Sequence, residues 1–95
     1  SWLYKDELIN LHQFLVYLMR FFVKNGVPED YFAKYKKLGI NPHHIHKPKA
    51  GQQHAVLVLS ECILAVMQKY YKNIPEELLK DFQEMEKRCK REMRE

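Results

Sequence analysis

Hydrophobic and polar positions repeat with helical spacing along most of the 95-residue chain. Between about Leu3 and Lys24, the polar residues fall on one narrow stripe of a helix, with Tyr17 filling its one gap: Asp6, Asn10, Gln13, Arg20 and Lys24. Asn25-Gly26, followed by Pro28, is a typical helix end. We therefore predict a long first helix with more apolar surface than one neighbouring helix can cover.

Three further helices are predicted downstream. A short helix from about Glu29 to Leu38 follows Pro28 and stops at Gly39. After a loop from Gly39 to about Pro48, a long helix from about Lys49 to Lys72 is apolar almost all round in its middle, which is typical of a central helix or a subunit contact. The last helix, from about Pro75 to the C-terminus, has one apolar stripe: Leu78, Phe82, Met85, Cys89 and Met93.

The predicted fold class is all-α, because no segment alternates with a period of two. We expect a four-helix bundle-like domain spanning residues 1–95, with two long inner helices, one short helix and a C-terminal helix. The surplus apolar faces of the two long helices predict a homodimer. The alternative is a monomer whose inner helices are covered by its own chain.

Composition adds a charge asymmetry to this picture. The net charge is +4, and the excess lies in residues 28–50, which contain five lysines: Lys34, Lys36, Lys37, Lys47 and Lys49. A basic patch can bind nucleic acid, although a charge of +4 is also ordinary for a small soluble domain. Apolar runs of at most six residues predict no membrane partner and no signal peptide. Cys62 and Cys89 are expected to be reduced, as in a cytoplasmic protein.

Histidines are the candidate metal ligands. His43 and His46 lie three positions apart in the loop, His54 follows in the next helix, and His12 lies on the apolar side of the first helix. Convergence of His12, His43 or His46, and His54 would suit a divalent transition metal such as zinc, the one cofactor that the sequence suggests. The alternative for His12 is a core histidine that is hydrogen-bonded to the backbone or to another side chain.

The same loop is a candidate anion site. The helix from Lys49 begins directly after it, and free N–H groups at a helix start favour anions. The candidate residues are Lys47, Lys49, His46 and Lys37. Motifs for phosphate loops, dinucleotide binding or a nucleophilic serine are absent from the sequence, so an enzymatic activity is not expected.

Two stretches carry a resemblance to a known family: YKDELINLHQFLVYLMRFF (4–22) and YFAKYKKLGINPHHIHKPKAGQQHAVLVL (31–59). The Leu11-His12 pair and the loop pattern P-x-x-I-H-x-x-K, here residues 42–49, resemble an uncharacterised family of short archaeal proteins. The resemblance covers roughly residues 4–67. It implies an all-helical fold in an archaeal cytoplasm, and it implies no substrate. The neutral Gly51-Gln52-Gln53 departs from the charged residues expected before His54.

Three functions follow from these observations. The first is a non-enzymatic homodimeric helical module for interaction or regulation. The second is a nucleic-acid- or ribosome-associated protein that binds phosphates through the basic histidine and lysine loop. The third is a metal-binding protein that uses the clustered histidines.

Overall fold

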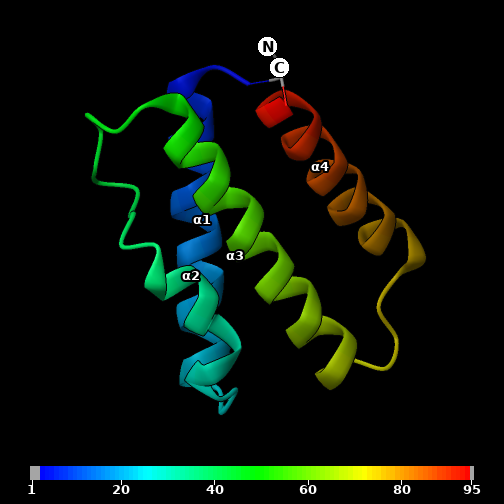
Figure 1. Cartoon of the computed structure of the whole chain (residues 1–95). Coiled ribbons are helices and arrows are strands. Elements are labelled where there is room, and N and C mark those ends of the chain that lie inside the picture. The colour runs from blue at the N-terminus through cyan, green and yellow to red at the C-terminus, as the bar shows by residue number, and fades with distance from the viewer. Residues whose placement is uncertain (1–2, 95) are drawn as a thin grey trace.

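The computed structural model describes residues 3–94 and confirms an all-α, bundle-like fold (Figure 1). Three long helices, α1 (Lys5–Lys24), α3 (Lys49–Tyr70) and α4 (Glu76–Arg94), are joined by a short helical segment, a loop and a turn. The positive φ angles of Gly26 (99°) and Gly39 (63°) fit the predicted ends of the helices before them. The starts of α3 and α4 directly after Pro48 and Pro75 also match the prediction.

The predicted single helix from Glu29 to Leu38 is wrong in detail. The segment begins with a 3₁₀ helix, η1 (Glu29–Phe32), which continues into α2 (Ala33–Lys37). The Tyr31 N–H donates to the Pro28 carbonyl, three residues back, which is the tighter 3₁₀ pattern. The turn buries Phe32 completely and seats Tyr35 in the core. Packing of these two rings therefore decides the local geometry.

The long helix α3 is the centre of the molecule. It packs against α1, α4, α2 and η1, and five of its apolar side chains are fully buried: Ala55, Val56, Leu59, Ile63 and Val66. Segments of the same chain thus cover most of the apolar surface of α3, and the homodimer stays a prediction. By length and composition α3 could also span a membrane, but its burial within the described fold accounts for that composition.

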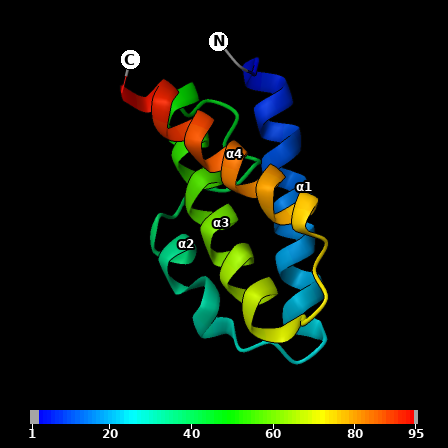
Figure 2. The ribbon, with the colours of Figure 1, turned by 90° about the vertical axis from the view of Figure 1, so that its right-hand side faces the viewer.

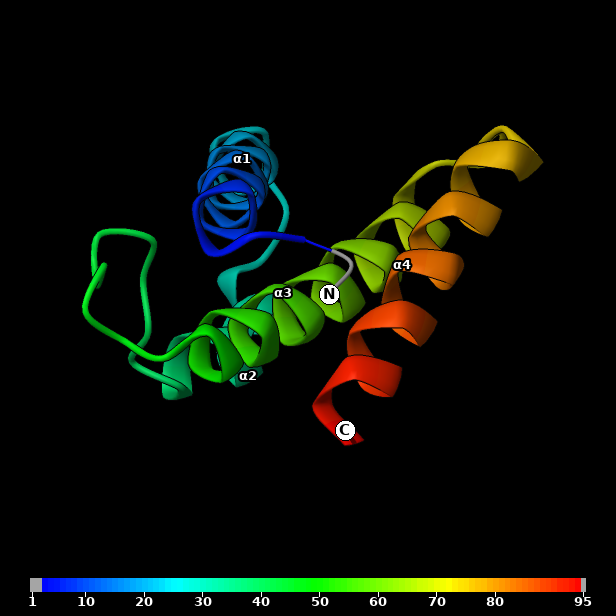
Figure 3. The same ribbon diagram turned by 90° about the horizontal axis from the view of Figure 1, so that it is seen from above.

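The helices α1 and α4 lie on different sides of α3. Viewed from above, they stand apart with α3 between them (Figure 3), and Figure 2 shows α4 running obliquely to α1. Both pack extensively on α3, but within the described residues they do not pack extensively on each other. As a result, α1 leaves large side chains on its outer side uncovered, most prominently Phe14, Tyr17 and Phe21.

Candidate functional site

Two features could serve function: a buried polar network around His12 and an apolar groove between α1 and α4. The first begins at His12, which is fully buried in the middle of α1. Its Nδ1 lies 2.6 Å from Oε1 of Gln52 on α3, and its Nε2 lies 2.6 Å from the Tyr35 hydroxyl on α2. Three helices are therefore joined through one imidazole ring.

The hydrogen atoms of this network can be assigned from its geometry. Nε2 of Gln52 faces the carbonyl oxygens of Asn41, at 3.3 Å, and His44, at 3.4 Å, which can only accept. The amide oxygen of Gln52 therefore faces His12, so Nδ1 of His12 carries a hydrogen and donates it. In the neutral ring, Nε2 then accepts the hydroxyl hydrogen of Tyr35.

Burial keeps both titratable members of the network neutral. Desolvation lowers the pKa of His12, and the hydrogen bond to Gln52 offsets part of that effect. Desolvation also raises the pKa of Tyr35 to about 12, against a smaller opposite effect of Arg20. Near neutral pH the network is thus an uncharged, satisfied cluster. It fixes the loop of residues 38–48 to the core through two backbone carbonyls.

This burial predicts a pH dependence of stability. Because the pKa of His12 is lower in the folded state, the unfolded chain takes up a proton more readily once the pH falls below the ordinary value of 6.5. The contribution of neutral His12 to the free energy of unfolding is present above that pH. It is lost as the pH falls, by up to about 1.4 kcal/mol per pH unit. Urea titrations at several pH values measure it.

The exposed His46 supplies the control for this titration. The His46→Gln variant should lose stability at acidic pH in the same way as the wild type, because the side chain of His46 lies at the surface. A free energy of unfolding that stays constant in the wild-type protein from pH 7 to pH 5 would contradict a neutral His12 in the core.

The histidines predicted as metal ligands are not brought together. Both ring nitrogens of His12 are occupied by hydrogen bonds, and His43 and His46 are exposed. Nδ1 of His54 is buried without a hydrogen-bond partner among the described residues. Within residues 3–94, no group of three or more His, Cys, Asp or Glu side chains is placed to hold a metal ion. His12 thus matches the alternative of a hydrogen-bonded core histidine.

The predicted anion-binding residues lie on the surface. Lys37 and Lys47 are exposed, as is His46, and Lys49 is half-buried at the start of α3. His46 and Lys47 line a shallow hollow of about 400 Å³ that is formed entirely by the loop.

Sequence reasoning missed Tyr35 and Gln52 as the partners of His12. Gln52 lies four positions before Val56 and seven before Leu59, so it falls on the apolar side of its helix. A polar side chain on such a face needs a buried partner, and this signal could have identified Gln52. The pairing itself links positions 40 and 23 residues apart, which local periodicity does not report.

The second feature is the apolar groove, a cavity of about 430 Å³ between α1 and α4 with α3 at its base. Its walls are almost entirely apolar. Phe14, Leu18 and Phe22 come from α1, Met67 from α3, and Leu78 and Phe82 from α4. No charged side chain is among the residues that line it. The groove is therefore suited to an apolar partner surface rather than to a charged ligand.

An exposed aromatic ridge runs along α1 beside this groove. It consists of Phe14, Tyr17 and Phe21, whose exposed fractions are 60%, 59% and 55%. The steps of three and four residues place the three rings in a row along the helix. Phe14 belongs to both features, since it also forms part of the groove wall. The ridge and the groove thus form one continuous apolar face.

Fold and site together define a small all-helical protein with a neutral polar core network and an open apolar face. Residues 3–89 match the model of the uncharacterised protein family UPF0058, and the chain belongs to that family.

Relatives of this family come from several archaea. A UPF0058 protein of Methanothermobacter thermautotrophicus is 39% identical over 93 residues, which cover 96% of this chain and 90% of the relative. The UPF0058 protein MJ1132 of Methanocaldococcus jannaschii is 33% identical, over 86% of this chain and 75% of the relative. A UPF0058 protein of Archaeoglobus fulgidus is 31% identical, over 81% and 80%. No solved structure matches the chain.

Proposed function

We propose that this protein is a homodimeric helical interaction module, in which the aromatic ridge of each copy packs into the apolar groove of the other. The observation that carries the proposal is the juxtaposition of ridge and groove on one face. A twofold dimer requires a surface that is complementary to itself, since each copy contributes the same patch. A face that carries both an apolar projection and an apolar depression meets this requirement.

The size of this face supports a second copy as the occupant. An aromatic side chain buries about 150–250 Å², so covering three rings that are more than half exposed removes about 350 Å² per copy from water. The two equivalent contacts of a twofold dimer would therefore cover about 700 Å² of aromatic surface, together with the groove walls opposite it. Aromatic side chains also dominate the energy of such contacts.

The oligomeric state tests this proposal. Sedimentation velocity or light scattering of the untagged chain at micromolar concentration should give twice the 11.5 kDa of a single chain. The mass should fall towards that of one chain on dilution, because the association is reversible. A particle of 11.5 kDa that persists at 100 micromolar protein would refute the proposed dimer.

A further inference from the structure

The segment from α2 through the following loop is rich in lysine. Residues 31–60 contain five lysines and no aspartate or glutamate. Five side chains at the end of α2 and along the following loop form what we call the basic face: Lys37, His43, His46, Lys47 and Lys49. All but Lys49 are exposed. Among the described residues, no carboxylate lies within ion-pair distance of Lys37 or Lys47.

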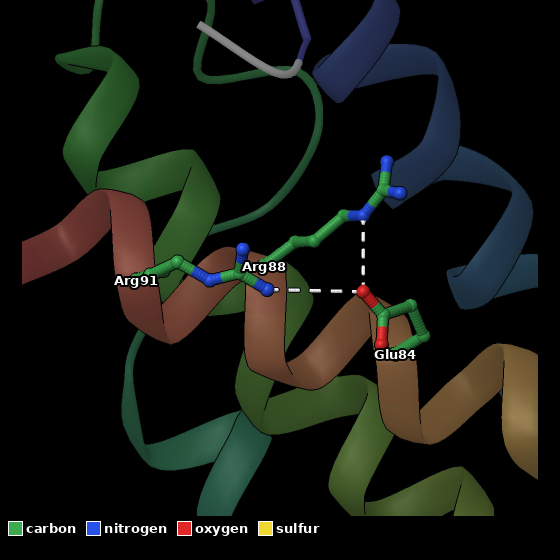
Figure 4. Close-up of polar contacts among 3 residues, drawn as sticks. All are labelled: Glu84, Arg88 and Arg91. Carbon is green, nitrogen blue, oxygen red and sulfur yellow. Dashed lines mark hydrogen bonds and ion pairs between the residues drawn. The ribbon is translucent and has the colours of Figure 1, made fainter.

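The surface of α4 shows the opposite arrangement. It carries acidic and basic side chains that pair along the helix, as between Glu76 and Lys80 and between Glu86 and Lys90. Glu84 lies 3.3 Å from Nε of Arg88 and 3.7 Å from an Nη atom of Arg91, so one carboxylate serves two guanidinium groups (Figure 4). The charges of α4 therefore largely balance, whereas residues 28–50 carry +3 of the chain's net charge of +4.

The basic face is separate from the proposed dimer interface. The loop and α2 lie on the side of α3 away from α4 (Figures 1 and 3), whereas the groove lies between α1 and α4. A second copy in the groove would thus leave the basic face open to another partner.

The backbone that carries these charges is held in place from the core. Gln52 donates to the carbonyls of Asn41 and His44, and Pro42 is buried. The Asn41 side chain accepts the His43 N–H at 3.0 Å. Binding of a partner therefore costs the loop less conformational entropy than it would cost a flexible segment.

We propose that the basic face binds the phosphate backbone of nucleic acid. Lysine ammonium groups recognise phosphates as point charges, and their binding releases the counterions condensed on the polymer. Residues 37–49 contain no Phe, Tyr or Trp on which a base could stack. The binding should therefore depend on salt and have little sequence preference. This proposal does not depend on the dimer.

Fluorescence anisotropy tests the proposal with two labelled probes, a 20-nucleotide single-stranded RNA and a 20-base-pair DNA. With three to four phosphate contacts, affinity for the single strand should fall about 20- to 50-fold between 50 and 200 mM NaCl. The Lys37→Glu/Lys47→Glu variant should lose at least tenfold in affinity at 50 mM NaCl. The Lys37→Arg/Lys47→Arg variant should bind like the wild type, because it keeps both charges.

A variant of equal net charge provides the matched control. Lys72 and Lys87 are exposed in the turn before α4 and on α4, so the Lys72→Glu/Lys87→Glu variant should keep the wild-type affinity. An equal loss in this control would overturn the proposal, because bulk charge rather than the basic face would then govern binding. Absence of binding to both probes at 50 mM NaCl, or equally tight binding of poly-glutamate, would also overturn it.

Discussion

Replacing Gln52 by leucine is expected to destabilise the protein by about 2–4 kcal/mol, because it removes the partner of the buried His12 ring and of two backbone carbonyls at once. The substitution leaves Nδ1–H of His12 without an acceptor in a fully buried site. It also deprives the carbonyls of Asn41 and His44 of their donor. Such a loss is a large part of the stability of a domain of this size. Urea unfolding followed by circular dichroism, at one fixed protein concentration, measures it.

The neighbouring glutamine offers a matched control. Gln53 is also buried, but its amide donates to a single group, the carboxylate of Glu92 on α4. Gln53→Leu should therefore lower the free energy of unfolding less than Gln52→Leu does, by at least about 1 kcal/mol, because it leaves fewer polar groups without a hydrogen-bond partner. Equal effects of the two substitutions would show that the His12 network contributes no more than an ordinary buried amide.

Replacing Phe14 by glutamate is expected to weaken the dimer at least 100-fold while leaving the fold intact. The side chain is 60% exposed in a single copy, so the isolated chain should tolerate the carboxylate with little change in stability. In the proposed dimer the same carboxylate would be buried in an apolar groove without a partner, which is strongly unfavourable. Sedimentation equilibrium gives the dissociation constant, and circular dichroism checks the helix content.

Ile45→Glu is the matched control for the dimer. Ile45 is 56% exposed, close to the value for Phe14, but it lies in the loop, away from the groove. This variant should dimerise like the wild type. If Phe14→Glu kept the wild-type dissociation constant, the ridge and groove could not be the contact between copies.

The sequence predicted the helices well because their ends are marked locally. Pro48 and Pro75 lie directly before helices, and Gly26 and Gly39 take the positive φ angles that end them. The 3₁₀ form of Glu29–Phe32 was not predicted, since it follows from how Phe32 and Tyr35 pack in the core. Proline and glycine residues thus marked where the helices begin and end, and tertiary contacts determined the type of helix in Glu29–Phe32.

The candidate site was less accessible to sequence reasoning. The position of His12 on an apolar helix face indicated a core histidine, but its partners come from α2 and α3 through packing that no local pattern specifies. Periodicity also overestimated the free apolar surface of α3, because it cannot show that four segments of the same chain surround one helix. The groove depends on the angle between α1 and α4, which neither helix encodes alone.

Contacts between copies can be observed directly in a mixed sample of isotope-labelled and unlabelled protein. An isotope-filtered NOE spectrum of that sample records only pairs of protons from different chains. If the ridge of one copy packs in the groove of the other, the rings of Tyr17 and Phe21 should show such NOEs to side chains of Met67 and Leu78. A spectrum without NOEs between chains, or with NOEs confined to residues outside the ridge and groove, would contradict the proposed interface.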